Sequence, residues 1–155
     1  MNQYTTLYIV RHGQTNWNVE GRMQGHKNSV LTESGKEQAR VLAAELRNTH
    51  FDAIFSSDLT RAKDTAEILA EERSLAVKTA EALRERTQGR LDGRLLKEIQ
   101  KELRETFDAY ESMSDVERMQ QRLVPDAETL EETVTRFIRF LRELAVAYIG
   151  KTILI

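Results

Sequence analysis

His12 is the residue of this sequence best suited to chemistry, because it ends an apolar run and lies between Arg11 and Gly13. The run Leu7–Val10 is typical of a strand, and open α/β sheets bind ligands where their strands end. An unprotonated imidazole can attack phosphorus, and an arginine presents a planar fork that matches phosphate oxygens. Gly13 permits a close approach of the backbone to the ligand, or an unusual turn. We therefore predict that His12 is the nucleophile of a phosphoryl-transfer site, in preference to a polar residue that merely ends a strand.

Two further charged residues fit the same reaction. Arg61 is expected in the first turn of a helix, where a cation opposes the helix dipole and a bound anion would offset that cost. Taken alone, an exposed surface arginine explains Arg61 about as well. Glu85 lies between Arg84 and Arg86, and a carboxyl group near a phosphate can keep a proton for the leaving oxygen. A solvated run of charges is the usual explanation, so only the glycine-rich surroundings favour a catalytic Glu85.

Neutral polar residues after the first strand are candidate donors to a phosphate. They are Thr15, Asn18, Gln24 and Gly25. Nothing in the sequence alone separates them from ordinary loop residues. His26 and His50 lack the spacing of metal ligands, so both are expected to be structural or exposed, and no metal site is predicted.

Composition limits the classes of protein to which the chain can belong. Its 155 residues are expected to form one domain, 1–155, with a sizeable core. The formal net charge of −2 argues against a nucleic-acid or membrane-surface binder, although a small basic pocket remains compatible with it. The absence of Cys excludes disulfides and a thiolate nucleophile. With no bilayer-length apolar run and no signal-peptide pattern, a cytoplasmic location is expected.

The apolar pattern of the first half predicts alternating strands and helices. The expected elements are strands over Thr5–Val10, Phe51–Phe55 and Leu75–Lys78, and helices over Thr32–Asn48 and Leu59–Glu72. The first strand is expected to be buried on both faces, and Arg11–Leu31 to be one long functional loop. Strands that alternate with helices in this order predict a parallel sheet with crossover helices.

The second half begins with a break in this pattern. Residues 83–126 are expected to form an insertion that caps the sheet, with helical spacing over Leu95–Leu103 and Phe107–Leu123. A strongly amphipathic helix is expected between Thr129 and Gly150. The composition of Lys151–Ile155 predicts a further strand. The fold class is therefore α/β, with a mostly parallel central sheet between two layers of helices.

Several of these stretches together resemble the histidine phosphatase superfamily, which includes cofactor-dependent phosphoglycerate mutases and fructose-2,6-bisphosphatase-like enzymes. The matching stretches are Val10–Asn18, Gln24–Gly25, Leu31–Gly35 with Gln38–Ala39, Ser56–Ala62, and Leu83–Arg86 with Gly89 and Gly93. Their order and spacing cover nearly the whole chain, so the combination is far more specific than any piece. The resemblance implies a phosphoglycerate mutase-like fold of three layers.

The resemblance also implies a role for each matching residue. His12 would be the phosphorylated nucleophile, and Arg11 and Arg61 would bind the phosphoryl group. Glu85 would be the acid and base, and Asn18 would be the loop asparagine that contacts the phosphate. No metal or organic cofactor is implied, because the arginines would supply the positive charge. The implied ligand is a small phosphorylated substrate or inorganic phosphate.

The sequence departs from the family's pattern in two places. The family carries a second catalytic histidine, in a His-Gly pair after the strand that follows the long C-terminal helix, and here that pair would fall just past Ile155. We therefore expect a domain that is incomplete at its C-terminus and weakened in activity, with uncovered strand edges that favour homo-oligomers. A smaller departure is Ala127-Glu128-Thr129, where the family often has Gly-Glu-Ser.

The function that this resemblance favours is the hydrolysis of a small phosphomonoester through phosphohistidine. Mutases of the family usually carry a longer insertion after the acidic residue, whereas Glu85 leads directly to Gly93 and a helix. A cofactor-dependent phosphoglycerate mutase is the alternative within the family. An inactive protein that binds phosphorylated ligands or a partner is the alternative from another class, and the missing histidine motivates it.

Overall fold

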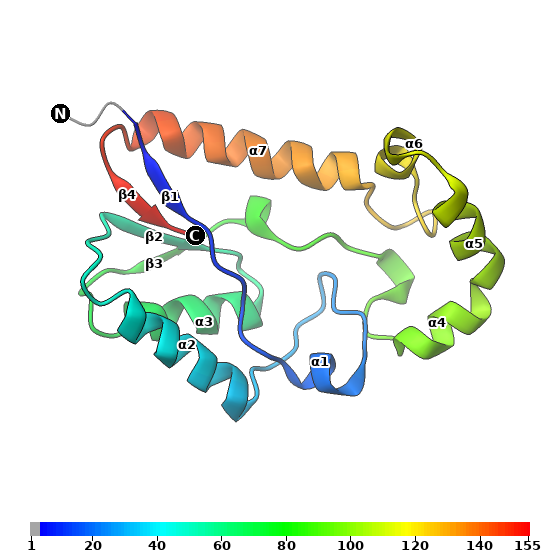
Figure 1. Ribbon diagram of the computed structural model, residues 1–155, viewed down its shortest axis with the longest axis horizontal. Coiled ribbons are helices and arrows are strands. Elements are labelled where there is room, and N and C mark those ends of the chain that lie inside the picture. The colour runs from blue at the N-terminus through cyan, green and yellow to red at the C-terminus, as the bar shows by residue number, and fades with distance from the viewer. Residues whose placement is uncertain (1–3) are drawn as a thin grey trace.

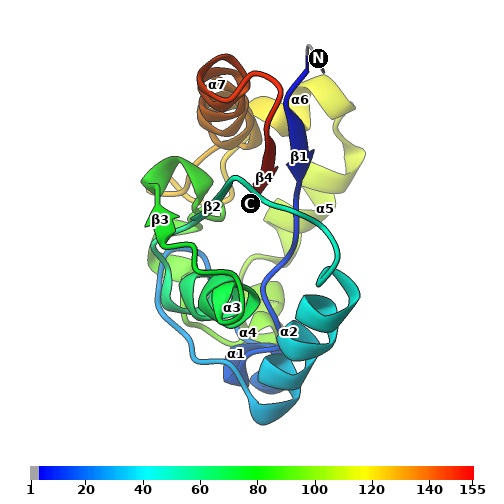
Figure 2. The same ribbon diagram turned by 90° about the vertical axis from the view of Figure 1, so that its left-hand side faces the viewer.

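The computed structural model describes residues 4–155 and centres on a four-stranded parallel sheet with helices on both sides (Figures 1 and 2). The strands are β1 (Thr6–Tyr8), β2 (Ala53–Ser56), β3 (Val77–Thr79) and β4 (Thr152–Leu154). Their spatial order is β1-β4-β2-β3, so the last strand of the chain joins the first strand to the other two. This arrangement confirms the expected three-layer α/β fold.

The two outer layers are made by the longer helices. Helices α2 (Glu33–Glu45) and α3 (Thr60–Ala70) cover one face of the sheet, and α7 (Leu130–Ala147) covers the other (Figure 2). The shorter elements are α1 (Asn16–Glu20), the 3-10 turns η1 (Glu81–Leu83) and η2 (Gly89–Leu91), α4 (Leu96–Glu102), α5 (Arg104–Ser112) and α6 (Asp115–Gln120). Within residues 4–155, no helix combines the length and the apolar character needed to cross a membrane.

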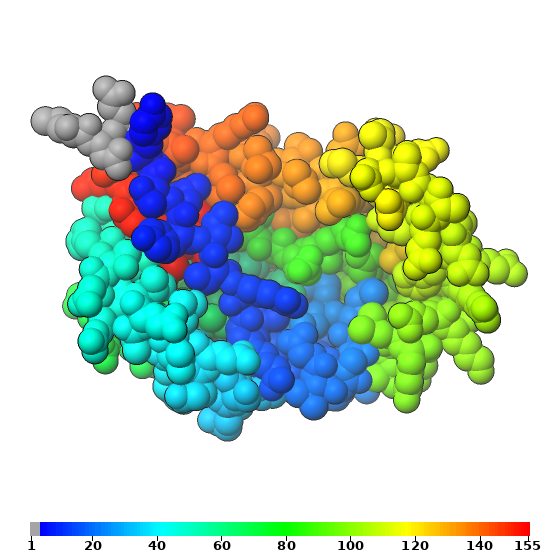
Figure 3. Space-filling model, viewed as in Figure 1, coloured from blue at the N-terminus to red at the C-terminus, as the bar shows by residue number. Residues whose placement is uncertain are grey.

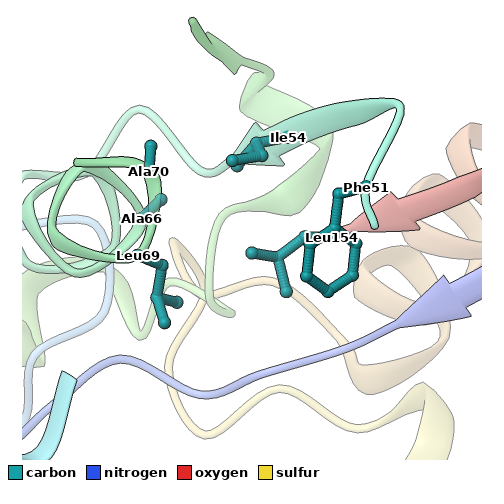
Figure 4. Close-up of a cluster of buried hydrophobic side chains, with 6 residues drawn as sticks. All are labelled: Phe51, Ile54, Ala66, Leu69, Ala70 and Leu154. Carbon is teal, nitrogen blue, oxygen red and sulfur yellow. The ribbon is translucent and has the colours of Figure 1, made fainter. Parts of the chain in front are cut away.

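The main core lies between the sheet and α3 (Figure 4). Its buried members are Phe51, Ile54, Ala66, Leu69, Ala70 and Leu154. Side chains alternate across β2, so Phe55 lies on the other face and packs edge-on against Phe140 and Tyr148, with ring centroids 5.8 and 5.9 Å away. Strand β2 is thereby packed on both faces, which fixes its carboxyl end.

Residues 83–126 contain a second buried cluster. It consists of Leu91, Ile99 and Val124, together with Ala127, which lies just after this range. Helices α4 to α6 gather at the end of the molecule away from the strands (Figure 3, green to yellow). Backbone hydrogen bonds join this region to the loop after β1, from Met23 N to Arg94 O at 3.0 Å and from Leu96 N to Gly21 O at 2.8 Å. Its description as a capping insertion stays a prediction.

Two expectations about the N-terminal part were wrong. The first strand is not buried on both faces, since Tyr8 is 37% and Ile9 57% exposed. Strand β1 pairs with β4 alone, and apolar composition does not reveal which strand lies at the edge of a sheet. Residues Arg11–Leu31 are not one loop, because α1 forms within them behind a capping box of Thr15 and Asn18.

The C-terminal helices also differ in detail from expectation. The stretch Phe107–Leu123 divides into α5 and α6, because Ser114 forms a capping box with Glu117 and begins a new helix. Helix α7 begins as expected after Thr129, which forms a capping box with Glu132. Within α7 only Leu144 is fully buried, so much of its apolar face is partly exposed.

Replacing Ile54 by Ala tests the main core. Ile54 is 0% exposed between the sheet and α3, so Ile54→Ala is expected to lower the free energy of unfolding by about 2–5 kcal/mol. Val146→Ala is the control, because Val146 is 74% exposed on α7 and its loss should cost no more than about 0.5 kcal/mol. Urea unfolding followed by circular dichroism measures both. Equal costs for the two variants would contradict this placement of the core.

Candidate active site

The four charged or ionisable residues predicted to do chemistry meet at the carboxyl ends of β1 and β2. Arg11 and His12 follow β1, Arg61 lies in the first turn of α3 after β2, and Glu85 follows η1. All four line two adjoining cavities of about 270 and 200 Å³. The four side chains therefore meet where the rule for parallel strands places a ligand, and the binding of a ligand there stays a prediction.

The His12 ring lies in a position that defines its tautomer. Its Nδ1 is 2.8 Å from Gly13 O, and because a carbonyl only accepts, Nδ1 carries the proton and Nε2 keeps its lone pair. Burial lowers the pKa of His12 below 6.5, and the nearby Arg61 and Arg11 lower it further, against the opposing effects of the Gly13 hydrogen bond and Glu85. The imidazole is therefore neutral at pH 7, as a nucleophile must be.

Gly13 fixes the backbone beside His12. A Cβ at this position would lie 2.3 Å from Gly35 O, at the start of α2, so only glycine fits. The Gly13 N–H donates to Thr65 Oγ1 in α3 at 3.1 Å. The close approach that requires glycine here is to Gly35 in α2, whereas an approach of this backbone to a ligand stays a prediction.

Arg61 is buried, with only 1% of its surface exposed. Its Nη1 donates to Lys27 O at 3.0 Å and its Nη2 to Gly25 O at 2.8 Å, whereas its buried Nε has no partner among the described residues. Burial lowers the pKa of Arg61, but Glu85 and Asp92 oppose this effect, and a guanidinium stays charged at neutral pH. This environment excludes the exposed-surface explanation and suits the binding of an anion.

Asp92 joins the loop after β1 to the loop that carries Glu85. This carboxylate is 3% exposed and accepts from His26 N at 3.0 Å, Gln88 N at 2.9 Å and Thr87 Oγ1 at 2.7 Å. Gly25 has a φ of +49°, and a Cβ there would lie 1.9 Å from Asp92 Oδ1. Sequence reasoning missed Asp92, for which flanking glycines are the only local signal.

The neutral candidates divide into two pairs. Gln24 and Gly25 line the smaller cavity, although Gln24 Oε1 already accepts from Thr15 Oγ1 at 2.9 Å. Thr15 and Asn18 line neither cavity, because their side chains cap α1 and Asn18 Oδ1 accepts from Thr15 N at 3.0 Å. Contact of Thr15 and Asn18 with a phosphate stays a prediction that this arrangement does not display.

Glu85 lies in an irregular segment and its residue surface is exposed. Its Oε1 accepts from the Arg86 N–H at 2.8 Å. The neighbouring Arg84 forms two hydrogen bonds with Asp58, at 2.8 and 2.5 Å, which lower the pKa of that carboxyl group. His26, expected to be structural or exposed, donates from Nε2 to Glu85 O at 2.7 Å and thus contacts the site's own segment.

The smaller cavity is strongly basic in a chain of near-neutral charge. Its ionisable lining comprises four arginines, one glutamate and His12, and the arginines are Arg11, Arg22, Arg61 and Arg86. A concentration of one charge in a cavity attracts a ligand of the opposite charge. The cavity therefore suits a small anion that carries more than one negative charge, as a phosphate ester does at neutral pH.

Comparison with protein families agrees with this chemistry. The model of the histidine phosphatase superfamily (branch 1) matches residues 7–155. A curated relative from Yersinia pestis (strain Pestoides F), "Probable phosphoglycerate mutase GpmB", is 44% identical over 88 residues. That match covers 57% of this chain and 41% of the relative, so the matched part spans less than half the relative's length.

Solved structures match over almost the whole chain. YhfR of Bacillus stearothermophilus is 33% identical with a TM-score of 0.86, and the match covers 97% of this chain and 72% of YhfR. A phosphoglycerate mutase from Bacillus anthracis is 27% identical with a TM-score of 0.87, over 99% and 74% of the two chains. A mycobacterial glucosyl-3-phosphoglycerate phosphatase is 30% identical with a TM-score of 0.81, over 94% and 72%. Proteins similar to this chain thus include phosphatases and mutases.

The pKa of His12 is directly measurable. We expect it to lie below 6.5 because burial and two cations disfavour the imidazolium, and we expect Arg11→Gln to raise it by removing one of those cations. Proton NMR titration of the imidazole signals measures both, and His12→Ala identifies the signal. A value above 6.5 in the unaltered chain, or a decrease in Arg11→Gln, would contradict this account of the site.

The contact between Gly25 and Asp92 gives a second test. Gly21→Ala places a side chain at a φ of +66° with nothing within 4 Å, so it should cost only the left-handed strain, about 1–2 kcal/mol. Gly25→Ala adds a clash with a buried carboxylate and should destabilise the fold by clearly more. Urea unfolding compares the two variants. A smaller cost for Gly25→Ala than for Gly21→Ala would show that the two loops are not joined in this way.

Proposed function

The chain belongs to the histidine phosphatase superfamily, and on that premise we propose that it hydrolyses phosphoric monoesters of small metabolites through a phosphohistidine at His12. One observation carries the proposal. The His12 ring donates from Nδ1 to Gly13 O, which leaves Nε2 unprotonated in the neutral ring, and His12 lines the same cavity as the buried cation Arg61. A neutral nucleophile and a fixed positive charge are the two requirements for attack on a phosphate dianion.

In the first step, Nε2 of His12 attacks phosphorus while the bond from phosphorus to the leaving oxygen breaks. Arg11 and Arg61, which both line the two cavities, bind the phosphoryl oxygens. Each charge-assisted hydrogen bond of this kind contributes roughly 1.5–3 kcal/mol. Glu85, in its protonated form, gives its proton to the leaving oxygen, so the alcohol departs neutral.

In the second step, the Glu85 carboxylate takes a proton from water as the water oxygen attacks phosphorus. The bond between phosphorus and Nε2 breaks, inorganic phosphate is released, and His12 returns to its neutral form. Glu85 is then protonated again, as the first step requires. Acid and base are one residue, so its position relative to His12 matters in both steps.

A cofactor-dependent phosphoglycerate mutase is the second candidate. The specific observation in its favour is the similarity to the Yersinia relative, named a probable phosphoglycerate mutase, and to the Bacillus anthracis structure, named a phosphoglycerate mutase. In a mutase the phosphohistidine passes its phosphoryl group to a phosphoglycerate and not to water. Conversion of 3-phosphoglycerate to 2-phosphoglycerate that requires 2,3-bisphosphoglycerate and exceeds phosphate release would favour this candidate.

Hydrolysis of p-nitrophenyl phosphate by the purified chain tests the proposal. His12→Ala is expected to lower kcat by about 10³-fold or more, because it removes the nucleophile. The acidic limb of the kcat/KM profile should fall at a pH below 6.5, because His12 must be neutral to attack and its pKa is lowered. Quenched reactions should contain phosphoprotein that is stable in alkali and labile in acid, as phosphohistidine is.

His50→Ala is the matched control for the nucleophile. The His50 side chain is 85% exposed and lies outside both cavities, so its loss should leave kcat unchanged. Phosphate binding without any turnover would favour the alternative of a ligand-binding protein. Turnover that survives His12→Ala would overturn the proposed mechanism.

A further inference from the structure

The Glu85 carboxyl group lies on a segment that no secondary structure stabilises. Residues 84–88 connect η1 to η2, and Glu85 is exposed. A general acid must lie within hydrogen-bond distance of the oxygen that it protonates, and displacement by about 1 Å can cost about 10²-fold in rate. Contacts from elsewhere in the fold must therefore fix the main chain at this point.

Two side chains from distant parts of the chain bind the Glu85 carbonyl oxygen. His26 donates to it from Nε2 at 2.7 Å, and Arg136 of α7 donates from Nη2 at 3.0 Å. Arg136 also donates from Nη1 to Ala82 O at 2.9 Å. One guanidinium therefore bonds to the main chain at two points three residues apart, which fixes the course of the segment that carries the acid.

Glu128 fixes Arg136 in turn. Its Oε1 accepts from Arg136 Nε and its Oε2 from Arg136 Nη2, both at 3.0 Å. The same Oε2 accepts from the Thr87 N–H at 3.2 Å, so Glu128 also contacts the far end of the Glu85 segment. Burial acts to raise the pKa of Glu128, but the hydrogen bonds from Arg136 and Thr87 outweigh it and lower the pKa.

The ion pair of Arg136 and Glu128 differs from a surface ion pair because it is more buried and because Arg136 also donates to main-chain carbonyls. The side chains of Arg136 and Glu128 are 22% and 21% exposed, and solvent screens such a pair less than an exposed one. Arg139, one turn away on α7, is 81% exposed and pairs with Glu143 of the same helix. Arg136 uses its remaining donors on carbonyls of the Glu85 segment, and Arg139 does not.

We propose that Glu128 and Arg136, together with His26, are positioning residues that keep the Glu85 carboxyl group within reach of the leaving oxygen by fixing the main chain from Ala82 to Thr87. The inference rests on the proposed function, because it takes Glu85 to be the acid. None of the three residues needs to contact the substrate. Their loss therefore impairs proton transfer to the leaving group and leaves the nucleophile His12 in place.

The experiment compares two esters that differ in their need for an acid. p-Nitrophenolate departs without a proton, whereas the alkoxide of 2-glycerophosphate requires one. For Arg136→Ala and Glu128→Gln we expect kcat/KM, which reports phosphoryl transfer to His12 and not the later attack of water, to fall about 10–100-fold on 2-glycerophosphate and less than about threefold on p-nitrophenyl phosphate. Glu85→Gln should show the same contrast, and adding Arg136→Ala to it should cause little further loss, because both changes remove one function.

Two further variants separate positioning from general stability. Arg139→Ala, on the same helix, should leave both esters unaffected. Arg136→Lys should recover little of the lost rate, because an ammonium cannot reproduce the planar bonds to Glu128 and to two carbonyls. Equal losses on both esters for Arg136→Ala, or additive losses in the Glu85→Gln double variant, would overturn the inference.

Hydrogen exchange supplies a measurement that does not depend on turnover. Arg136→Ala should accelerate amide exchange within residues 82–87 by about tenfold or more, with exchange in β2 and α3 unchanged. If the chain hydrolyses neither ester, the proposed function fails, and exchange alone then decides whether Arg136 fixes the segment. Unchanged exchange in residues 82–87 would overturn the inference in either case.

Discussion

The buried charge of Arg61 is the constraint on which the arrangement of the site depends. A guanidinium removed from water costs several kcal/mol unless its N–H groups are bonded and its charge is offset. The carbonyl groups of Gly25 and Lys27 meet the first need, so the loop after β1 must pass over the start of α3. Asp92 supplies negative charge nearby and also accepts the His26 N–H of that loop. The requirement to bury one cation thus orders two loops at once.

The same cation explains why His12 suits its predicted task. Arg61 and Arg11 disfavour the imidazolium, and burial has the larger effect in the same direction. The positive charge proposed to bind a phosphoryl group therefore also favours the neutral form of the His12 ring. The Gly13 carbonyl then selects the tautomer, and it does so through the backbone beside the ring itself. In the proposed mechanism, the binding of the phosphoryl group and the nucleophilicity of His12 therefore depend on the same two cations, Arg11 and Arg61.

The sequence predicted the features that depend on local pattern and missed those that depend on distant contacts. Alternating apolar segments located the strands and the longer helices, and the strand-end rule brought His12 and Arg61 together. The edge position of β1 was not predictable, because it depends on where β4 inserts. Arg136 was missed because its partner lies 51 residues away in the chain. The spacing of residues along the sequence does not indicate such a long-range contact. A single Arg on the polar face of an amphipathic helix is ordinarily expected to be solvated.

The two halves of the site are fixed by different means, and this difference decides which half can move. Backbone packing of Gly13 against Gly35 leaves no room at the nucleophile, so His12 can shift only if α2 shifts with it. Glu85 is fixed instead by side chains, chiefly Arg136, and its distance from His12 therefore depends on how α7 is placed. That helix is joined to the sheet through the contacts of Phe55 with Phe140 and with Tyr148, the residue that caps the end of α7. The packing of one amphipathic helix thus sets the separation of Glu85 and His12, the proposed acid and nucleophile, although neither residue belongs to it.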